Sequence, residues 1–117
     1  MKTVARRENV PIIDLTAMST TLYETLGEEG SKQTLVHYPA NTFPGQGKPL
    51  ADNTHFNPFG AWQIAKMVVM GLKQMNSPLA DHLRPDWQDY DPARPDDPAR
   101  FVWYMSGTGN ILKPDGN

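Results

Sequence analysis

The chain has 117 residues with 11 basic and 13 acidic side chains, which give a formal net charge of −2. This length fits one small domain, and the near-neutral charge excludes nucleic-acid binding driven by a basic surface. The absence of cysteine excludes a disulfide scaffold, a thiolate zinc site and a cysteine nucleophile. No apolar run approaches the roughly 20 residues that span a bilayer, and no apolar segment follows the basic N-terminus as in a signal peptide. We therefore predict a domain that needs neither nucleic acid nor a membrane as its partner.

Val10–Leu15 is a short apolar run, VPIIDL, rich in β-branched side chains. A continuous run of this kind is typical of a strand buried on both faces, as in a parallel sheet. Pro11 is tolerated there because it lies near the start of the strand. Thr16 or Ser19 can then cap a helix that ends at Gly27. The apolar face of this helix would consist of Met18, Leu22 and Leu26.

A second and stronger helix is predicted after residue 57. Residues 30–57 are punctuated by proline and glycine and are predicted to form a loop. Asn57 is a favourable N-cap residue, and Pro58 occupies the first helical position, where proline is preferred. Apolar side chains recur at helical spacing through residues 61–75. We expect four polar side chains to face away from the core: Gln63, Lys66, Lys73 and Gln74.

The composition changes after residue 83. Residues 84–100 hold five aspartates, three arginines and four prolines, and residues 101–105 form an isolated strand-like patch. One buried strand cannot form a sheet alone, so this inventory indicates the last part of a larger α/β domain. We predict that residues 1–83 are the C-terminal part of that domain and that residues 84–117 are a Pro/Asp-rich tail packing on it.

The candidate chemistry lies in Asp52-Asn53-Thr54-His55, directly ahead of the strong helix. An aspartate and a histidine three residues apart on a loop can meet. The carboxylate would then accept a hydrogen bond from imidazole Nδ1–H and fix the tautomer of the ring. Nε2 would be left to take a proton from a serine hydroxyl.

The stretch from Asp52 to Ala61, DNTHFNPFGA, resembles the last conserved block of the SGNH, or GDSL-type, hydrolases. Within that superfamily it is most similar to the rhamnogalacturonan acetylesterases and their bacterial relatives. Residues 10–15 resemble the strand before that block, and residues 22–27 the helix that follows this strand. The closing KPDGN at residues 113–117 resembles the C-terminus of related proteins. The resemblance covers residues 5–83 well and the tail more loosely.

The resemblance implies a three-layer α/β/α (flavodoxin-like) sandwich with a parallel sheet, followed by an irregular tail. It implies that Asp52 and His55 are the acid and base of a Ser-His-Asp triad that deacetylates a pectic polysaccharide such as rhamnogalacturonan, with no metal or organic cofactor. Full-length members are expected to be secreted or periplasmic. Their nucleophile lies in an N-terminal Gly-Asp-Ser motif, which none of the four serines here matches: Ser19, Ser31, Ser77 and Ser106. We therefore expect the missing N-terminal half as a partner and little activity from this chain alone.

Other interpretations of the candidate residues stay open. Asp52 and His55 could form a capped turn with a surface histidine, or bind a metal with His37, although their irregular spacing is a weak metal signal. Asp14 lies where α/β proteins place functional groups, but it is more typical of a residue that caps the next turn. His82 is typical of a solvated residue that complements a helix dipole.

A non-catalytic function as a carbohydrate-binding or structural remnant of such an enzyme is a further alternative. Rings in the tail could stack on sugar faces, or they could pin the tail onto the domain. Gly45-Gln46-Gly47-Lys48 does not fit a phosphate-binding loop, because Pro49 follows the lysine. The compact Asp-x-x-His pair also disfavours the α/β-hydrolases, whose acid and histidine lie on separate loops. The tail aromatics considered are Trp87, Tyr90, Phe101, Trp103 and Tyr104.

Overall fold

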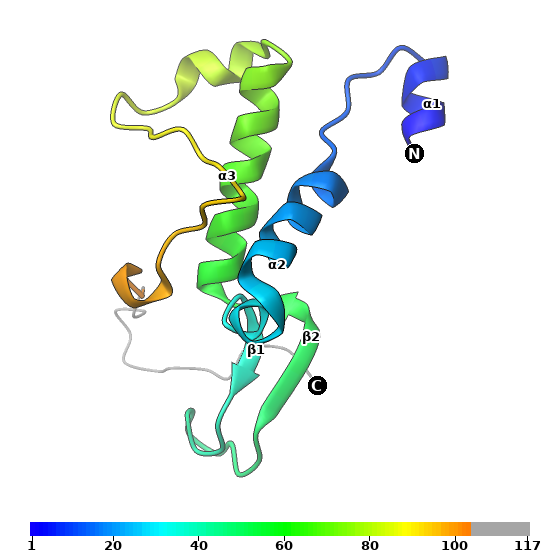
Figure 1. The fold of residues 1–117 in the computed structure, drawn as a ribbon. Coiled ribbons are helices and arrows are strands. Elements are labelled where there is room, and N and C mark those ends of the chain that lie inside the picture. The colour runs from blue at the N-terminus through cyan, green and yellow to red at the C-terminus, as the bar shows by residue number, and fades with distance from the viewer. Residues whose placement is uncertain (104–117) are drawn as a thin grey trace.

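The structure is a computed structural model, which describes residues 1–103. Two helices of 17–18 residues stand beside a small two-stranded sheet (Figure 1). The predicted patch at residues 101–105 lies partly outside the described residues, and residues 101–103 are not in a strand. The closing residues 113–117 lie outside them as well. In chain order the elements are α1 (Lys2–Arg7), α2 (Leu15–Lys32), β1 (Leu35–Tyr38), β2 (Leu50–Phe56), α3 (Pro58–Gln74), η1 (Pro78–His82) and η2 (Pro98–Arg100).

The strand predicted at Val10–Leu15 is wrong, because residues 10–14 are irregular and α2 already begins at Leu15. A strand is stable only when neighbouring strands satisfy its backbone, and residues 1–103 offer this segment none. Asp14 caps α2, with its side chain accepting a hydrogen bond from the Ala17 amide at 3.2 Å. The helix was predicted to stop at Gly27, and its backbone does leave helical geometry there (φ 66°), but a further turn continues to Lys32.

The prediction of a loop for residues 30–57 is also wrong, because this segment contains β1 and β2, which pair in an antiparallel sheet. Leu35 and Val36 of β1 are buried. Buried Gln46 closes the connection between the strands by donating to the carbonyls of Pro39 (2.8 Å) and Lys48 (2.7 Å). The α/β class is confirmed, whereas the described residues contain no parallel sheet and no third layer.

Helix α3 begins as predicted, with the Asn57 side chain accepting from the Gly60 amide and Pro58 in the first turn. The prediction that Gln63 faces away from the core is wrong, because this side chain is fully buried. Tyr90 covers it and donates a 2.8 Å hydrogen bond to its Oε1. Lys66 is largely buried as well and forms an ion pair with Asp96. The tail thus occupies the face of α3 that helical periodicity alone assigns to solvent.

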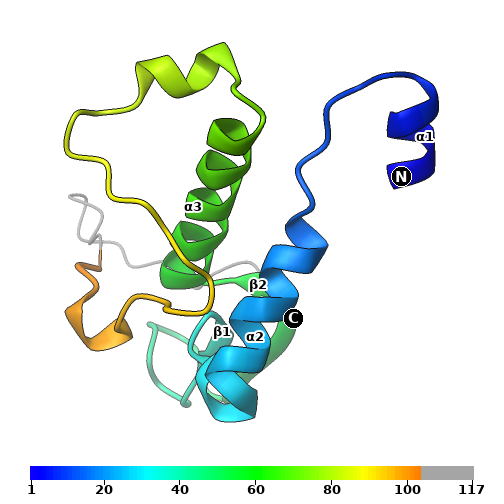
Figure 2. The same cartoon turned by 45° about the horizontal axis from the view of Figure 1, so that its top comes forward.

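Helices α2 and α3 run side by side, and the chain after α3 returns along α3 (Figure 2). Their shared core consists of Leu22, Met67 and Tyr90, with partly buried side chains around it. The radius of gyration is 16.8 Å, against about 13 Å for a compact domain of about 100 residues. The protein is therefore more extended than a compact domain of similar length. No helix within residues 1–103 is both long enough and apolar enough to cross a membrane.

Candidate active site

The stretch from Asp52 to His55 forms a bulge in β2, not the separate loop that the sequence predicted. Val36 pairs with Asp52, but the preceding residue Leu35 pairs with Phe56, so the three residues between Asp52 and Phe56 have no backbone pairing partner in β1. Such an insertion bends a strand and redirects its side chains. The Asp52 Oδ1 atom stabilises the bend by accepting from the amides of Thr54 (2.6 Å) and His55 (3.0 Å).

The bulge brings the two predicted site residues together, with Asp52 Oδ2 lying 2.8 Å from His55 Nδ1. The amides of His55 and Thr54 and then the His55 ring lower the pKa of Asp52 to about 2. An ionised carboxylate only accepts hydrogen bonds, so Nδ1 carries the proton in this contact. Within residues 1–103 Nε2 of His55 has no hydrogen-bond partner, and the His55 side chain is 57% exposed. The pair therefore presents an oriented, accessible imidazole nitrogen.

Asn57 anchors the end of the bulge to the body of the protein. Its backbone N–H donates to the Thr34 carbonyl (3.2 Å), and its side-chain Nδ2 donates to the carbonyls of Gln33 (2.8 Å) and Leu35 (3.0 Å). Its Oδ1 caps α3 through the Gly60 amide at 2.9 Å. The sequence predicted the cap but not the bonds to residues 33–35, because those partners lie more than 20 positions away. Asn57 thus fixes the backbone two residues after His55.

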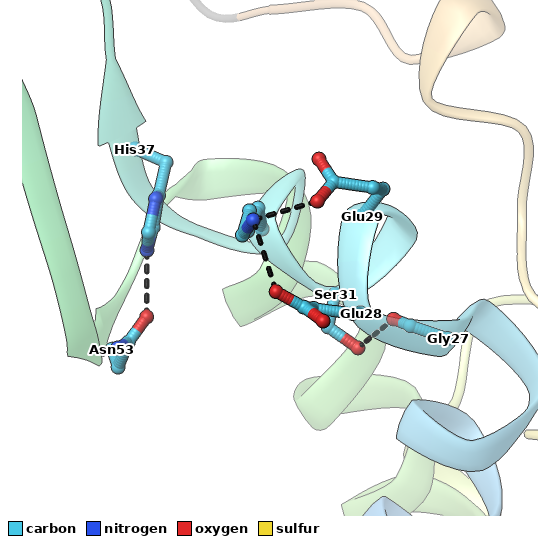
Figure 3. A network of polar contacts seen from close by, with 7 residues as sticks. Gly27, Glu28, Glu29, Ser31, His37 and Asn53 are labelled. Carbon is cyan, nitrogen blue, oxygen red and sulfur yellow. Dashed lines mark hydrogen bonds and ion pairs between the residues drawn. The ribbon is translucent and has the colours of Figure 1, made fainter.

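His37 contacts the bulge from β1, because its Nε2 lies 2.7 Å from Asn53 Oδ1. Figure 3 shows these two side chains pointing toward one another across the sheet. The described part of the chain contains no group of three or more His, Cys, Asp or Glu side chains arranged to hold a metal. The structure therefore does not assemble His37, Asp52 and His55 as metal ligands, and His37 instead braces the residue after Asp52.

A groove with a volume of about 520 Å³ lies beside the bulge and includes Asn53 and Thr54 in its wall. Lys32 in this wall is 2.7 Å from Glu29 and 3.4 Å from Glu28. Figure 3 also shows these contacts and the Ser31 hydroxyl that donates to the Gly27 carbonyl at 2.6 Å. The remaining wall consists of Tyr23, Leu35 and Phe56.

The other predicted candidates lie away from the Asp52–His55 pair. Asp14 caps α2 and pairs with Lys2, and His82 lies exposed in η1. Ser19 and Ser77 make local hydrogen bonds to backbone within their own turns. Ser106 lies outside the described residues.

Comparison with known proteins shows that the chain is similar to carbohydrate esterases. It is 42% identical over 83 residues to rhamnogalacturonan acetylesterase RhgT of Bacillus subtilis (strain 168), an alignment that covers 71% of this chain and 36% of that protein. It is 32% identical over 83 residues to the probable rhamnogalacturonan acetylesterase YesY of the same organism, covering 71% of this chain and 34% of that protein. The chain thus spans about a third of the length of these curated relatives.

These matches confirm the resemblance to SGNH rhamnogalacturonan acetylesterases that the block around Asp52 and His55 indicates. No family model matches the chain. No solved structure matches it significantly either.

Proposed function

We propose that this chain supplies the histidine and the aspartate of a Ser-His-Asp esterase that deacetylates a pectic polysaccharide such as rhamnogalacturonan. The observation that carries the proposal is the 2.8 Å contact between Asp52 Oδ2 and His55 Nδ1 at an exposed bulge. It occurs in a chain whose relatives are named rhamnogalacturonan acetylesterases. General-base catalysis of acyl transfer requires an oriented imidazole with an accessible Nε2 atom.

In the proposed reaction His55 Nε2 removes the proton from a serine hydroxyl as the serine oxygen attacks the acetyl carbonyl. The same nitrogen then gives the proton to the departing sugar oxygen, which leaves as a hydroxyl and an acetyl-serine remains. His55 then takes a proton from a water molecule, whose oxygen attacks the acetyl-serine. The bond to the serine oxygen breaks, His55 returns the proton to that oxygen, and acetate is released. Throughout, the Asp52 carboxylate holds Nδ1–H and stabilises the imidazolium. These steps use protein side chains and water alone.

The serine in this proposal comes from a polypeptide that corresponds to the part of the relatives that this chain does not match, which the family resemblance implies is the N-terminal part. Within residues 1–103, no serine forms a hydrogen bond with His55. Several apolar side chains are exposed on the N-terminal segment and at the end of β2, and they would be covered by such a partner. The exposed fractions are 51% for Val4, 57% for Val10, 44% for Ile12 and 43% for Phe56.

We also propose that the enzyme acts in a secreted or periplasmic location, because a polymeric substrate is too large to enter a cell. The alternative function, a non-catalytic carbohydrate-binding remnant, is favoured by one observation only. A groove beside α3 has a half-exposed tryptophan, Trp62, in its wall.

A chimera tests the proposal. This chain would replace the part of rhamnogalacturonan acetylesterase RhgT to which it aligns, and acetate release from acetylated rhamnogalacturonan would be measured. We expect hydrolysis by the chimera and its near-complete loss in His55→Ala, whereas His82→Ala should retain activity. A chimera that is folded by circular dichroism yet releases no acetate, or one that retains activity after His55→Ala, would refute the proposal.

A further inference from the structure

A second groove, with a volume of about 450 Å³, lies beside the first turns of α3 and shares no lining residue with the groove at the bulge. Its volume falls within the range of roughly 300–1,000 Å³ that is typical of small-molecule sites. Trp62 from α3 forms one wall, and the chain around η2 forms the other. The residues of this second wall are Asp96, Asp97, Arg100, Phe101 and Val102.

The aromatic part of this groove is rigid but accessible. The Trp62 side chain is 47% exposed, and Lys66 Nζ lies 5.5 Å from its ring centroid. Phe101 packs edge-on against buried Phe59, with ring centroids 5.5 Å apart. A half-exposed indole held in place offers an apolar platform together with an N–H donor.

The polar part of the groove is also fixed. Asp96 accepts a 2.9 Å hydrogen bond from Gln63 Nε2 and pairs with Lys66. Partial burial alone would raise the pKa of Asp96, but these contacts hold it below its usual value. Asp97 accepts from the Ala99 amide at 2.9 Å. The charge of Asp96 is thus balanced by Lys66, and its position does not depend on a ligand.

Arg100 differs from its neighbours because it forms no ion pair with any residue of the described segment 1–103. Its exposed guanidinium can bind a carboxylate with two parallel hydrogen bonds. The groove therefore combines an aromatic platform, carboxylates that can accept hydrogen bonds from hydroxyl groups, and an arginine that forms no ion pair within residues 1–103.

We propose that this groove binds a uronic-acid residue of a polysaccharide. The sugar ring would pack on Trp62, its hydroxyls would donate to Asp97, and its carboxylate would pair with Arg100. The choice of an acidic sugar rests on the proposed function, because a rhamnogalacturonan contains galacturonate. The groove would hold the polymer without taking part in the chemistry. Of the sequence-based candidates for sugar stacking, Tyr90 is buried in the core, and Phe101 lies in the wall of the groove and is packed on Phe59.

The test is calorimetric titration of the 117-residue chain with trigalacturonate, with galactotriose and inorganic sulfate as comparison ligands. We expect binding of trigalacturonate that weakens as salt is added, and at least tenfold weaker binding of the other two ligands. Arg100→Gln and Trp62→Ala should each weaken trigalacturonate binding at least tenfold. Arg94→Gln, which alters another exposed arginine that lies outside the groove, should leave it unchanged.

His55→Ala should bind trigalacturonate as the unmodified chain does, which separates this proposal from the esterase proposal. Circular dichroism should show the same helix content for every variant. The groove proposal is overturned if sulfate binds as tightly as trigalacturonate, or if folded Arg100→Gln and Trp62→Ala retain full affinity. Neither result would affect the catalytic role proposed for His55.

Discussion

Gly60 lies against the backbone of Thr34 so closely that a β-carbon on Gly60 would stand 1.9 Å from the Thr34 carbonyl oxygen. A β-carbon there would also stand 2.8 Å from the carbonyl carbon. Both obstructing atoms belong to the backbone, so a flexible side chain cannot move aside to relieve the clash. Through this contact the first turn of α3 packs directly against the segment between α2 and β1.

We predict that Gly60→Ala destabilises the protein by about 1–3 kcal/mol, the usual cost of overpacking a tight contact. The control is Gly47→Ala, because a β-carbon at Gly47 would meet no atom within 4 Å. Urea unfolding followed by circular dichroism measures both variants. Equal stability of the two variants would show that α3 is not seated on Thr34.

Asn57 should contribute more than an ordinary helix cap. Loss of a cap costs about 1 kcal/mol, and Asn57→Ala would also remove the bonds to the carbonyls of Gln33 and Leu35. We therefore expect Asn57→Ala to cost about 2–3 kcal/mol. Asn57→Ser keeps a capping oxygen but lacks the side-chain amide donor. Its loss of stability should be about half that of Asn57→Ala. If Asn57→Ser proved as stable as the unmodified protein in urea, the bonds to residues 33–35 would be energetically unimportant.

The comparison of sequence and structure shows which features are local. Asn57 and Pro58 predict the start of α3 correctly, because a cap and its helix are close in sequence. The contact between Asp52 and His55 follows from a three-residue spacing, and it also forms. The catalytic roles assigned to these two residues remain predictions.

The incorrect predictions involve partners distant in sequence. The apolar run at Val10–Leu15 has the composition of a buried strand but no strand in residues 1–103 pairs with it. Gln63 has the polarity of a surface residue, yet Tyr90 and Asp96, 27 and 33 positions away, bury it and satisfy its amide. Periodicity on one helix cannot identify a covering segment of that kind.

The low pKa of Asp52 gives a prediction for acid conditions. The folded protein holds this pKa at about 2, below the ordinary value of about 3.9. Because the folded pKa is lowered, the stabilisation from Asp52 is present above about pH 4 and is lost as the pH falls toward 2. A carboxyl titration by nuclear magnetic resonance should show a midpoint near 2, and Asp52→Asn should lose less stability over this interval. A midpoint near 4 would show that the bulge does not hold the carboxylate in solution.

Tyr90 gives a matching prediction at alkaline pH. Burial, followed by the charges of Asp96 and Asp91, raises the pKa of this phenol above its ordinary value of 10.0. A raised folded pKa means that the stabilisation is complete below pH 10 and is lost as the pH rises above it. Ultraviolet titration should therefore show a late-ionising tyrosine that is absent from Tyr90→Phe. Complete tyrosine ionisation near pH 10 in the folded protein would contradict the burial of Tyr90.

The last prediction concerns turnover by the chimera proposed above. In Asp52→Asn the amide oxygen could still accept from the Thr54 and His55 amides, so we expect the bulge to remain folded. The amide nitrogen would then face His55 Nδ1 and donate to it, which favours the tautomer with the proton on Nε2. That tautomer cannot accept the serine proton.

For the same substitution in a serine protease, kcat falls about 10⁴-fold. We expect a smaller loss of about 10²–10³-fold, or about 3–4 kcal/mol, because the backbone of the bulge still holds the ring in place. Steady-state kinetics should show the loss in kcat, with little change in KM, while His82→Ala changes activity by less than about tenfold. An Asp52→Asn chimera with unchanged kcat, or a chelator that abolishes turnover, would contradict the proposed triad.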